Sequence, residues 1–331
     1  MIIAEIAQAH DGSLGTAHAY IDALSNTGVD AIKFQTHIAE AESSEFEPFR
    51  IKFSKQDATR FEYWKRMEFT LDQWKGLNAH AIEKGLELIS SPFSNLAVDW
   101  LEEVGVKRYK IGSGEVSNWL MLEKIAKTGK PVILSSGMSS WEEMDNTIEF
   151  LKPYGNQLSI MQCTTAYPTR PEQWGLNVIG ELRDRYNIPV GFSDHSGDIN
   201  ACLAAASLGA ELFEFHVIFD KRQFGPDTPA SITIDQTTQL TAGIRQIQTA
   251  LNSPINKANI ESYQQLKSIF EKSLAVNKSL KKGEIITVDH LESKKPKGYG
   301  IPAKEFKEVI GKKLIRDLTK WDFINWSDLE S

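Results

Sequence analysis

Residues 190–216 read VGFSDHSGDINACLAAASLGAELFEFH and show the pattern that decides the fold. An apolar run at Val190–Phe192 is followed by a stretch of helical period at Ile199–Leu208, and then by a second apolar run at Leu212–Phe215. Short apolar strands that alternate with helices are typical of a parallel sheet covered on both faces. The segment therefore predicts a right-handed βα unit followed by the next strand.

The same alternation extends along most of the chain. The other apolar runs of strand type are Ile2–Ile6, Ala31–Gln35, Leu86–Ser90, Arg108–Ile111, Val132–Leu134 and Leu158–Gln162. The other helical stretches include Thr16–Asn26, Ser94–Val104, Trp119–Lys127, Trp141–Leu151 and Ile234–Ala250. Eight strands with intervening helices are what a closed (β/α)₈ TIM barrel requires, and such a barrel needs about 250 residues. An open, doubly wound sheet is the alternative.

Two segments depart from this pattern. Residues 38–69 are rich in aromatic and charged side chains and are too long for a simple βα loop, so we expect an insertion over the barrel mouth. Residues 252–272 begin with Asn-Ser-Pro and contain a polar helical stretch, which indicates a linker. Short β-type runs with Lys-Gly turns then predict a small β-rich domain. The expected division is a barrel at 1–251, a linker at 252–272 and a small domain at 273–331.

Composition excludes several classes of protein. The chain has 331 residues, of which 41% are hydrophobic and 24% charged, and this is typical of a folded globular protein. The net charge of −7 argues against a nucleic-acid surface and against adhesion to anionic membranes. We expect neither a signal peptide nor a membrane span, because the first residues lack a basic stretch and no run approaches the ~18 apolar residues of a span. Cys163 and Cys202 lie in apolar runs, so we expect buried free thiols and a cytoplasmic protein.

In a (β/α)₈ barrel the functional groups lie at the carboxyl ends of the strands. The polar residues at the predicted ends are Glu5, Lys33, Gln35, Ser90, Ser91, Lys110, Ser113, Ser135, Ser136, Thr164, Thr165, Ser193, Asp194, His195 and His216. Lysines and hydroxyl groups suit phosphate and carboxylate oxygens. We therefore expect one face of the barrel to bind a small phosphorylated acid. His10 and His37 are expected to line the mouth.

Five of these positions allow two interpretations. His195 and His216 follow consecutive strands and predict a metal pair, because imidazole is a common ligand of Mn²⁺, Zn²⁺, Fe²⁺ and Co²⁺; the alternative is two histidines without a metal. Lys33 and Lys110 either hold a substrate anion or pair with strand-end carboxylates. Glu5, inside the apolar run IIAEIA, is either a catalytic acid–base or the partner of one of those lysines.

The strand-end motifs together resemble the sialic acid synthase family. The matching segments are AEIAQAHDGS, IKFQTH, ISSPFS, YKIGSGE, PVILSSGMSS, QCTTAYPT, GFSDHS, FEFHVIFD and FGPD, in this order. The tail SLKKGEIITVDHLESKKPKGYGI resembles the C-terminal antifreeze-like (SAF) domain of that family. The resemblance covers essentially the full chain. It implies condensation of phosphoenolpyruvate (PEP) with an open-chain aldose and release of phosphate.

The resemblance also implies roles for individual positions. His195 and His216 match the ligands of a divalent metal, Mn²⁺, with Mg²⁺ or Co²⁺ as alternatives, and Glu5 matches the catalytic glutamate. The positions that match PEP-binding residues are Lys33, Ser91, Lys110, Ser113, Ser135, Thr165 and Ser193. Those that face the acceptor sugar are Gln35, Tyr167, Asp227 and Lys295. A domain-swapped homodimer is implied as well, in which the SAF domain completes the neighbour's site.

Three departures from the family pattern concern the sugar. Thr165 stands where N-acetylneuraminate synthases often have Asn, and Phe224 stands where proline is common. The run Lys294–Gly298 lacks the arginine that in this family contacts the N-acetyl group of the sugar. Lys295 can supply the charge but not the planar fork of an arginine.

The acceptor is therefore open between N-acetylmannosamine, a diacetamido trideoxyhexose and an unacetylated hexose. The alternative functions are a metal-dependent pyruvate aldolase, a synthase for a phosphorylated aldose, a catalytically inactive relative and a binding protein without catalysis.

Overall fold

The computed structural model of the protein describes residues 1–330, and the chain divides into two units, Met1–Ser253 and Pro254–Ser331. The strands of the first unit are β1 (Ile2–Glu5), β2 (Ala31–Thr36), β3 (Glu87–Pro92), β4 (Tyr109–Ile111), β5 (Val132–Ser135), β6 (Leu158–Cys163), β7 (Val190–Asp194), β8 (Leu212–Ile218) and β9 (Ser231–Thr233). Its helices are α1 (Leu14–Leu24), α2 (Ala39–Glu42), α3 (Arg60–Met67), α4 (Leu71–Glu83), α5 (Asn95–Val104), α6 (Trp119–Ala126), α7 (Trp141–Leu151), α8 (Leu176–Tyr186), α9 (Asn200–Ser207) and α10 (Ile234–Leu251). Among the described residues, no helix is long and apolar enough to cross a membrane.

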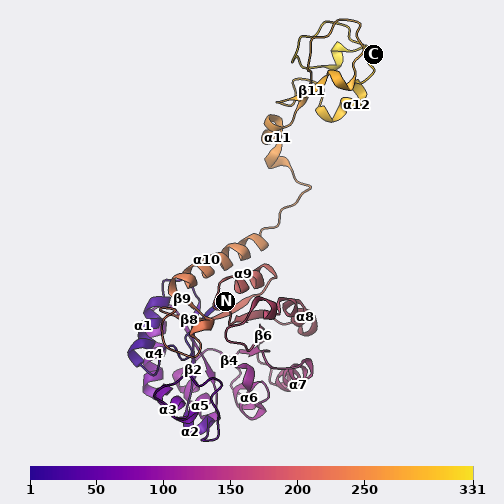
Figure 1. Ribbon diagram of the computed structural model, residues 1–331. Helices are drawn as coiled ribbons and strands as arrows, with labels where there is room; N and C mark the ends of the chain where they lie inside the picture. The colour runs from indigo at the N-terminus through magenta and orange to yellow at the C-terminus, as the bar shows by residue number, and fades with distance from the viewer. Residues whose placement is uncertain (331) are drawn as a thin grey trace. The chain divides into compact units, whose positions relative to one another are not determined.

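The sheet closes on itself. Neighbouring strands from β1 to β8 pair in parallel and in sequence order, and β1 pairs with both β2 and β8. Helices surround this ring of strands (Figure 1). The closed (β/α)₈ barrel predicted from the sequence is thus confirmed, and the open sheet is excluded. The short strand β9, which the apolar pattern did not predict, adds in parallel to β8.

Alternation of side chains along the strands builds the interior of the barrel. One buried apolar cluster takes a single residue from each of six strands: Ile3, Ala31, Ile89, Ile133, Met161 and Leu212. A larger cluster joins the outer faces of the strands to the helices. Since successive side chains point to opposite faces of a sheet, residues two positions further along these six strands also face inward. The apolar cluster therefore fills the barrel interior directly below these inward-facing residues.

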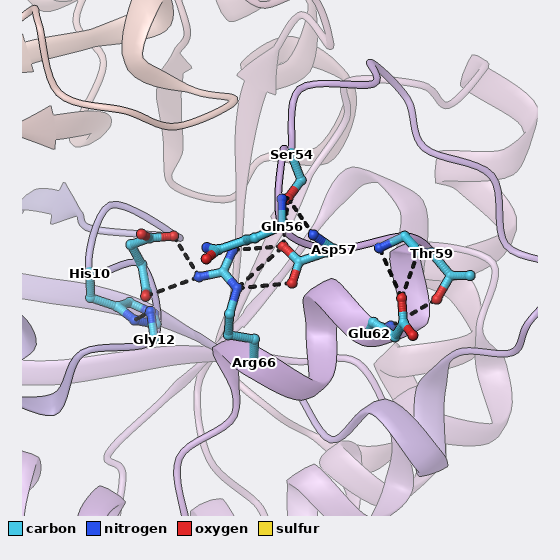
Figure 2. Close-up of polar contacts among 10 residues, drawn as sticks. His10, Gly12, Ser54, Gln56, Asp57, Thr59, Glu62 and Arg66 are labelled. Atoms are coloured by element: carbon cyan, nitrogen blue, oxygen red, sulfur yellow. Dashed lines mark hydrogen bonds and ion pairs between the residues drawn. The ribbon is translucent and has the colours of Figure 1, made fainter.

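The insertion at residues 38–69 has a small core of its own and is tied to the loop after β1. Tyr63, Trp64 and Met67 of α3 pack together with Ala39. Figure 2 shows Arg66 of α3 between Asp57 and the loop that holds His10 and Gly12. Its Nη2 lies 2.8 Å from Asp57 Oδ2, and its Nη1 lies 2.7 Å from Asp11 Oδ1. These contacts hold the insertion against the barrel.

The second unit has its own hydrophobic core, although it is small. After the helix α11 (Gln264–Phe270), the strands β10 (Ser273–Val276) and β11 (Leu291–Lys294) pair antiparallel, and a short helix α12 (Phe306–Val309) follows. The buried core residues are Leu274, Val276, Leu280, Ile286, Ile301, Val309, Leu314, Leu318, Ile324 and Leu329. Isolated bridges, rather than long strands, connect most of this unit. This matches the β-rich small domain expected from the sequence.

Two glycines allow a stability test of the contact between the insertion and the loop after β1. Both Gly12 and Gly85 have left-handed backbones, with φ of 77° and 76°. A Cβ at Gly12 would lie 2.3 Å from the backbone oxygen of Arg66, whereas a Cβ at Gly85 would meet nothing within 4 Å. Gly85→Ala should cost about 1–2 kcal/mol of unfolding free energy for the left-handed backbone. Gly12→Ala should cost at least about 2 kcal/mol more, because backbone atoms must move.

Denaturant unfolding of both variants measures this difference directly. Equal losses in the two variants would show that the chain accommodates the Gly12 collision without strain, and that the loop and the insertion are not held as closely as described.

Candidate active site

A charged layer lies directly above the apolar cluster of the barrel interior. Two residues beyond each cluster member, in chain order, stand Glu5, Lys33, Ser91, Ser135, Cys163 and Glu214. All are buried, and all line the same cavity. Glu5 is in register with both Lys33 on β2 and His216 on β8, and because the strands of a barrel are tilted, residues in register lie at different heights along its axis. Because side chains alternate along a strand with a period of two, the same six strands carry an apolar layer and, directly above it, a layer of functional groups.

Four buried charges form a continuous chain across this layer. Lys33 pairs with Glu5, and its Nζ also lies 3.6 Å from Glu214 Oε1. Lys110 Nζ lies 3.0 Å from the same Glu214 oxygen. The ion pairs considered for both lysines and for Glu5 are thus present in the structure. Glu214 is their common partner, and sequence reasoning missed it because it stands inside an apolar run. Its position two residues before His216 was the available signal.

Hydroxyl groups complete the lysine contacts. Lys110 donates to Ser135 Oγ at 2.7 Å, and Lys33 donates to Ser91 Oγ at 3.4 Å. Ser193 donates to Glu214 Oε1 at 3.3 Å. The neighbouring strand-end residues Ser90, Ser136 and Thr164 do not line the cavity, and their hydroxyls bond instead to Thr36, Met161 and Gln173. Only one residue of each adjacent pair faces inward, as the pleat requires.

The two carboxyl groups of this layer have opposite pKa shifts. Burial raises the pKa of Glu5 above its ordinary value, and Lys33 offsets only part of that effect. Burial also acts to raise the pKa of Glu214, but Lys110 and Lys33 outweigh it and hold the pKa below its ordinary value. Despite burial, Glu214 and Glu5 raise the pKa of Lys33. The two lysines thus favour the charged form of Glu214 more than that of Glu5. Carboxyl groups whose pKa values are pushed apart in this way are typical of acid–base sites.

His195 and His216 lie side by side one layer further out. Their ring centroids are 5.1 Å apart. His195 Nδ1 lies 3.0 Å from the carbonyl oxygen of Thr164, a contact in which Nδ1–H donates, so Nε2 is the nitrogen that would bind a metal once it has released its proton. This is how metal-binding histidines are oriented, so the pair fits a divalent cation. Among residues 1–330, no group of three or more His, Cys, Asp or Glu side chains could hold a metal. Substrate or water oxygens would have to supply the remaining ligands.

The environment of the two rings differs. Burial acts to lower the pKa of His195, but the adjacent Cys163 outweighs it and raises the pKa to about 9. Burial lowers the pKa of His216 well below its ordinary value, and His195 adds to this effect. Cys163 Sγ lies 3.8 Å from His195 Nδ1, and its thiol is free and buried as expected. Cys202 is likewise a free buried thiol.

In the outer part of the site, residues from the barrel loops contact a residue of the insertion. The ring centroid of Tyr167 lies 4.2 Å from that of His195. The guanidinium of Arg50, from the insertion, lies 4.0 Å above the Tyr167 ring, and its Nη2 is 2.8 Å from Asp227 Oδ1. Gln35 donates to Glu5 Oε1 at 3.0 Å and so links this part to the charged layer. Arg50 was not predicted from the sequence.

All these groups open into one cavity of about 380 Å³, a volume suited to a small-molecule ligand. The site residues predicted within the barrel that line it are Glu5, Lys33, Gln35, Ser91, Lys110, Ser113, Ser135, Thr165, Tyr167, Ser193, His195, His216 and Asp227. The insertion contributes Glu42, Glu47, Phe49, Arg50, Ile51, Phe53, Arg60, Tyr63 and Trp64, as expected for a segment over the mouth. His37 also lines the cavity. His10 does not, because it is buried against Phe34 and Phe69.

Lys295 is the predicted site residue that the structure does not bring into this cavity. It belongs to the second unit, where its Nζ lies 4.8 Å from the centroid of the Phe270 ring. The neighbouring Lys297 pairs with Glu271. Within one chain, therefore, Lys295 and Lys297 contact the linker residues Phe270 and Glu271, while Lys294 donates to the carbonyl oxygen of Trp321.

Charged groups buried at the carboxyl ends of barrel strands define this chain as a (β/α)₈ enzyme. The model of the NeuB family matches residues 20–256, and that of the SAF domain matches residues 271–330. The chain therefore belongs to the NeuB family, the nonulosonic acid synthases, and carries a C-terminal SAF domain.

Named relatives agree with this assignment. The N,N'-diacetyllegionaminic acid synthase of Campylobacter jejuni is 36% identical and covers 94% of this chain and 95% of its own. The N-acetylneuraminate-9-phosphate synthase of Homo sapiens is 34% identical over 98% of this chain and 90% of the relative. The crystal structure of the N-acetylneuraminic acid synthetase of Leptospira borgpetersenii, in complex with citrate, matches with a TM-score of 0.71 and 28% identity, covering 80% of this chain and 89% of that one.

The shared counter-charge predicts a large stability effect. Glu214→Ala should lower the unfolding free energy by about 3–5 kcal/mol, because it leaves Lys110 buried beside no carboxylate and Lys33 with one fewer. Glu123→Ala is the matched control, since Glu123 pairs with Lys127 on an exposed helix face. Denaturant unfolding should detect no change in the control. A small loss at Glu214 would show that the lysines do not depend on it.

The buried His10 predicts a pH dependence of stability. Burial, with His37 and Arg66 adding to it, lowers the pKa of His10 from 6.5 to about 3. Because the unfolded chain binds this proton and the folded chain does not, His10 lowers the unfolding free energy as pH falls from about 6.5 towards 3. The slope is about 1.4 kcal/mol per pH unit.

His10→Asn removes the titrating group and keeps an acceptor for the Gly12 N–H, which lies 3.1 Å from His10 Nδ1. Unfolding free energies of both proteins at pH 7.5, 6 and 5 should converge, or the variant should become the more stable, as pH falls. A difference between the two proteins that does not change with pH would contradict the assignment.

Proposed function

We propose that this enzyme condenses PEP with an open-chain N-acetylmannosamine-type aldose to give a 2-keto-3-deoxy nonulosonic acid and phosphate. The observation that carries the proposal is the layer of Lys33, Lys110 and serine hydroxyls at the bottom of one cavity, directly beneath the His195–His216 pair. The printed activities of the relatives support the same class of product.

The lysines and serines are suited to the two anionic ends of PEP. Lys110 uses two of its three N–H donors, on Ser135 and Glu214, so one remains for a carboxylate or phosphate oxygen. Those of Lys33 meet Glu5, Ser91 and Glu214, so a substrate anion would replace one of these partners. The hydroxyls of Ser91 and Ser135 stand beside these ammonium groups, and their position would fix the orientation of the enol. In this proposal Ser113, Thr165 and Ser193 complete the PEP site.

The chemistry follows from the order of the layers. Carbon 3 of PEP attacks the aldehyde carbon of the acceptor and forms the new C–C bond, water adds to carbon 2, and phosphate leaves by C–O cleavage. Glu5 stands between Lys33 and Gln35, and its raised pKa suits proton transfer with the adding water or the new hydroxyl. A divalent cation on His195 and His216, Mn²⁺ in this proposal with Mg²⁺ or Co²⁺ as alternatives, would supply Lewis-acid polarisation of the aldehyde.

The acceptor would lie further out, against Gln35, Tyr167 and Asp227, which line the cavity on the side of the insertion. A diacetamido trideoxyhexose or an unacetylated hexose would occupy the same place. We further propose a cytoplasmic homodimer in which Lys295 of one chain reaches the site of the other; sedimentation equilibrium and the acceptor KM of Lys295→Ala test this.

The experiment that tests the function measures phosphate release. With Mn²⁺, the enzyme should release phosphate from PEP in the presence of one of these aldoses and not in their absence. Pyruvate should not replace PEP, because a pyruvate aldolase would use it without releasing phosphate. Product formation from pyruvate, or no release with any aldose, would overturn the proposal.

Variants separate the roles of the residues. His195→Ala and His216→Ala should lose both phosphate release and tight Mn²⁺ binding, which calorimetry on the protein alone detects. Glu5→Ala should still bind PEP but lose turnover. Full activity in either histidine variant would contradict the metal site, and weak PEP binding by Glu5→Ala would make Glu5 a structural residue.

A further inference from the structure

The side chain of His37 is buried in the wall of the cavity, and the proposed chemistry does not use it. It follows β2 and is only 4% exposed. Its ring stacks between Trp64 of the insertion and Phe93, with ring centroids 4.0 Å and 4.6 Å away. Because the ring is held between two aromatic faces, its two nitrogens point in fixed directions along the wall.

The nitrogen Nδ1 of His37 faces a carboxylate. It lies 2.6 Å from Glu42 Oε1, and the side chain of Glu42 is only 6% exposed. The other oxygen of Glu42 accepts the backbone N–H of Ile38 at 3.4 Å, which helps to hold the carboxylate in place. Because an ionised carboxylate only accepts hydrogen bonds, Nδ1 carries the proton and donates this hydrogen bond. In the neutral ring, Nε2 is then left as an acceptor.

Two glutamine amides continue from Nε2 of His37 to Glu5. Gln8 Nε2 lies 2.8 Å from His37 Nε2 and donates to Gln35 Oε1 at 2.7 Å. Gln35 Nε2 in turn donates to Glu5 Oε1 at 3.0 Å. Together with the contact of Nδ1, these hydrogen bonds form one line from the insertion to the carboxylate of β1.

The acceptors at the two ends of this line fix the orientation of the groups between them. Ionised Glu5 needs the N–H side of the Gln35 amide, so the oxygen of Gln35 faces Gln8. That oxygen takes one N–H of Gln8, and the second N–H of the same group is directed to His37 Nε2. A proton on Nε2 could reach Gln35 Oε1 at 3.2 Å, but it would face the Gln8 donors at 2.8 Å. Only the tautomer with the proton on Nδ1 satisfies every contact.

The orientation of the Gln35 amide decides what Glu5 meets. With its N–H towards Glu5 Oε1, the amide stabilises the carboxylate, whose other oxygen pairs with Lys33. Turned over, the amide would present its carbonyl oxygen to Glu5, and the two acceptors would repel each other. The two orientations of an amide have nearly the same shape, so packing does not choose between them. The hydrogen bond from Gln8 does.

From these contacts we propose that His37 and Glu42 are positioning residues for Glu5. Glu42 fixes the tautomer of His37. Through Gln8, His37 then holds the Gln35 amide with its N–H towards the carboxylate. Glu42 belongs to α2, so the insertion takes part in aligning a residue of β1. The proposal rests on the proposed function for the role of Glu5 in turnover.

Removing the nitrogens of His37 while keeping an aromatic ring tests the proposal. In His37→Phe the ring can still stack between Trp64 and Phe93, but it accepts nothing from Gln8. The kcat for phosphate release should fall roughly tenfold or more, which is part of what a placed acid–base group contributes. The calorimetric Kd for PEP should not change. His37→Gln, whose amide oxygen can accept from Gln8, should recover part of kcat. Unchanged kcat in His37→Phe would overturn the proposal.

A double variant separates positioning from packing. Gln35→Met removes the last amide of the line, so adding His37→Phe to it should lower kcat no further. An equal further loss would show that His37 acts by packing alone, which contradicts the proposal.

The carboxylate of Glu42 allows a nearly isosteric test. Glu42→Gln no longer fixes the tautomer of His37, because an amide can donate as well as accept, and it should lower kcat. Glu40→Gln is the matched control on the same helix, since it removes an exposed carboxylate and should leave kcat unchanged. Unchanged kcat in Glu42→Gln would overturn the proposal, even if His37→Phe does not fold.

The tautomer of His37 can also be measured without turnover. ¹⁵N NMR of the histidine-labelled wild type should show a protonated Nδ1 and a bare Nε2 for His37 near neutral pH, with the resonances assigned by their loss in His37→Phe. A proton on Nε2 would overturn the proposal while phosphate release stands. No phosphate release by the wild type with any aldose would refute the proposed function, whereas the NMR result would still decide the orientation of the line.

Discussion

The parallel pairing of β1 with β8 is the contact on which the site depends. It closes the ring of strands and puts Glu5 in register with His216, although the two residues come from opposite ends of the barrel sequence. Closure also lets Lys110 on β4 reach Glu214 on β8 across the interior. In an open sheet these groups would lie strands apart, and their charges would have to be solvated separately.

Closure combines with side-chain alternation to stack the interior in layers. The apolar cluster excludes water from below, the four linked charges lie above it, and the histidines and the sugar-facing residues lie above those. A chain of buried ion pairs is a weak source of stability, because desolvation offsets most of the attraction. Its retention at the bottom of a ligand-sized cavity is better explained by substrate binding than by folding. The insertion supplies the wall that the barrel lacks.

Much of this could be predicted from the sequence. The strands were recognisable as apolar runs and the helices by their period, and the predicted helices agree with the structure within about two residues at each end. Because strand ends converge in any (β/α)₈ barrel, the polar residues that follow the runs identified 11 of the 32 residues that line the cavity, without coordinates. The two histidines were paired by the same reasoning. Apolar runs, helical periods and the residues at strand ends are local properties, so they can be read directly from the sequence.

The tertiary structure alone decided which of these residues interact. Glu214 looked like part of an apolar strand until the closed ring placed it between Lys33 and Lys110. The choice of Ser91 over Ser90 depended on which face of β3 points inward. Arg50 and Asp227 meet through the fold of an insertion whose own sequence has no regular period. Periodicity reports which face of an element is buried, but a contact between distant segments depends on how the elements close in space, and only the folded chain contains that information.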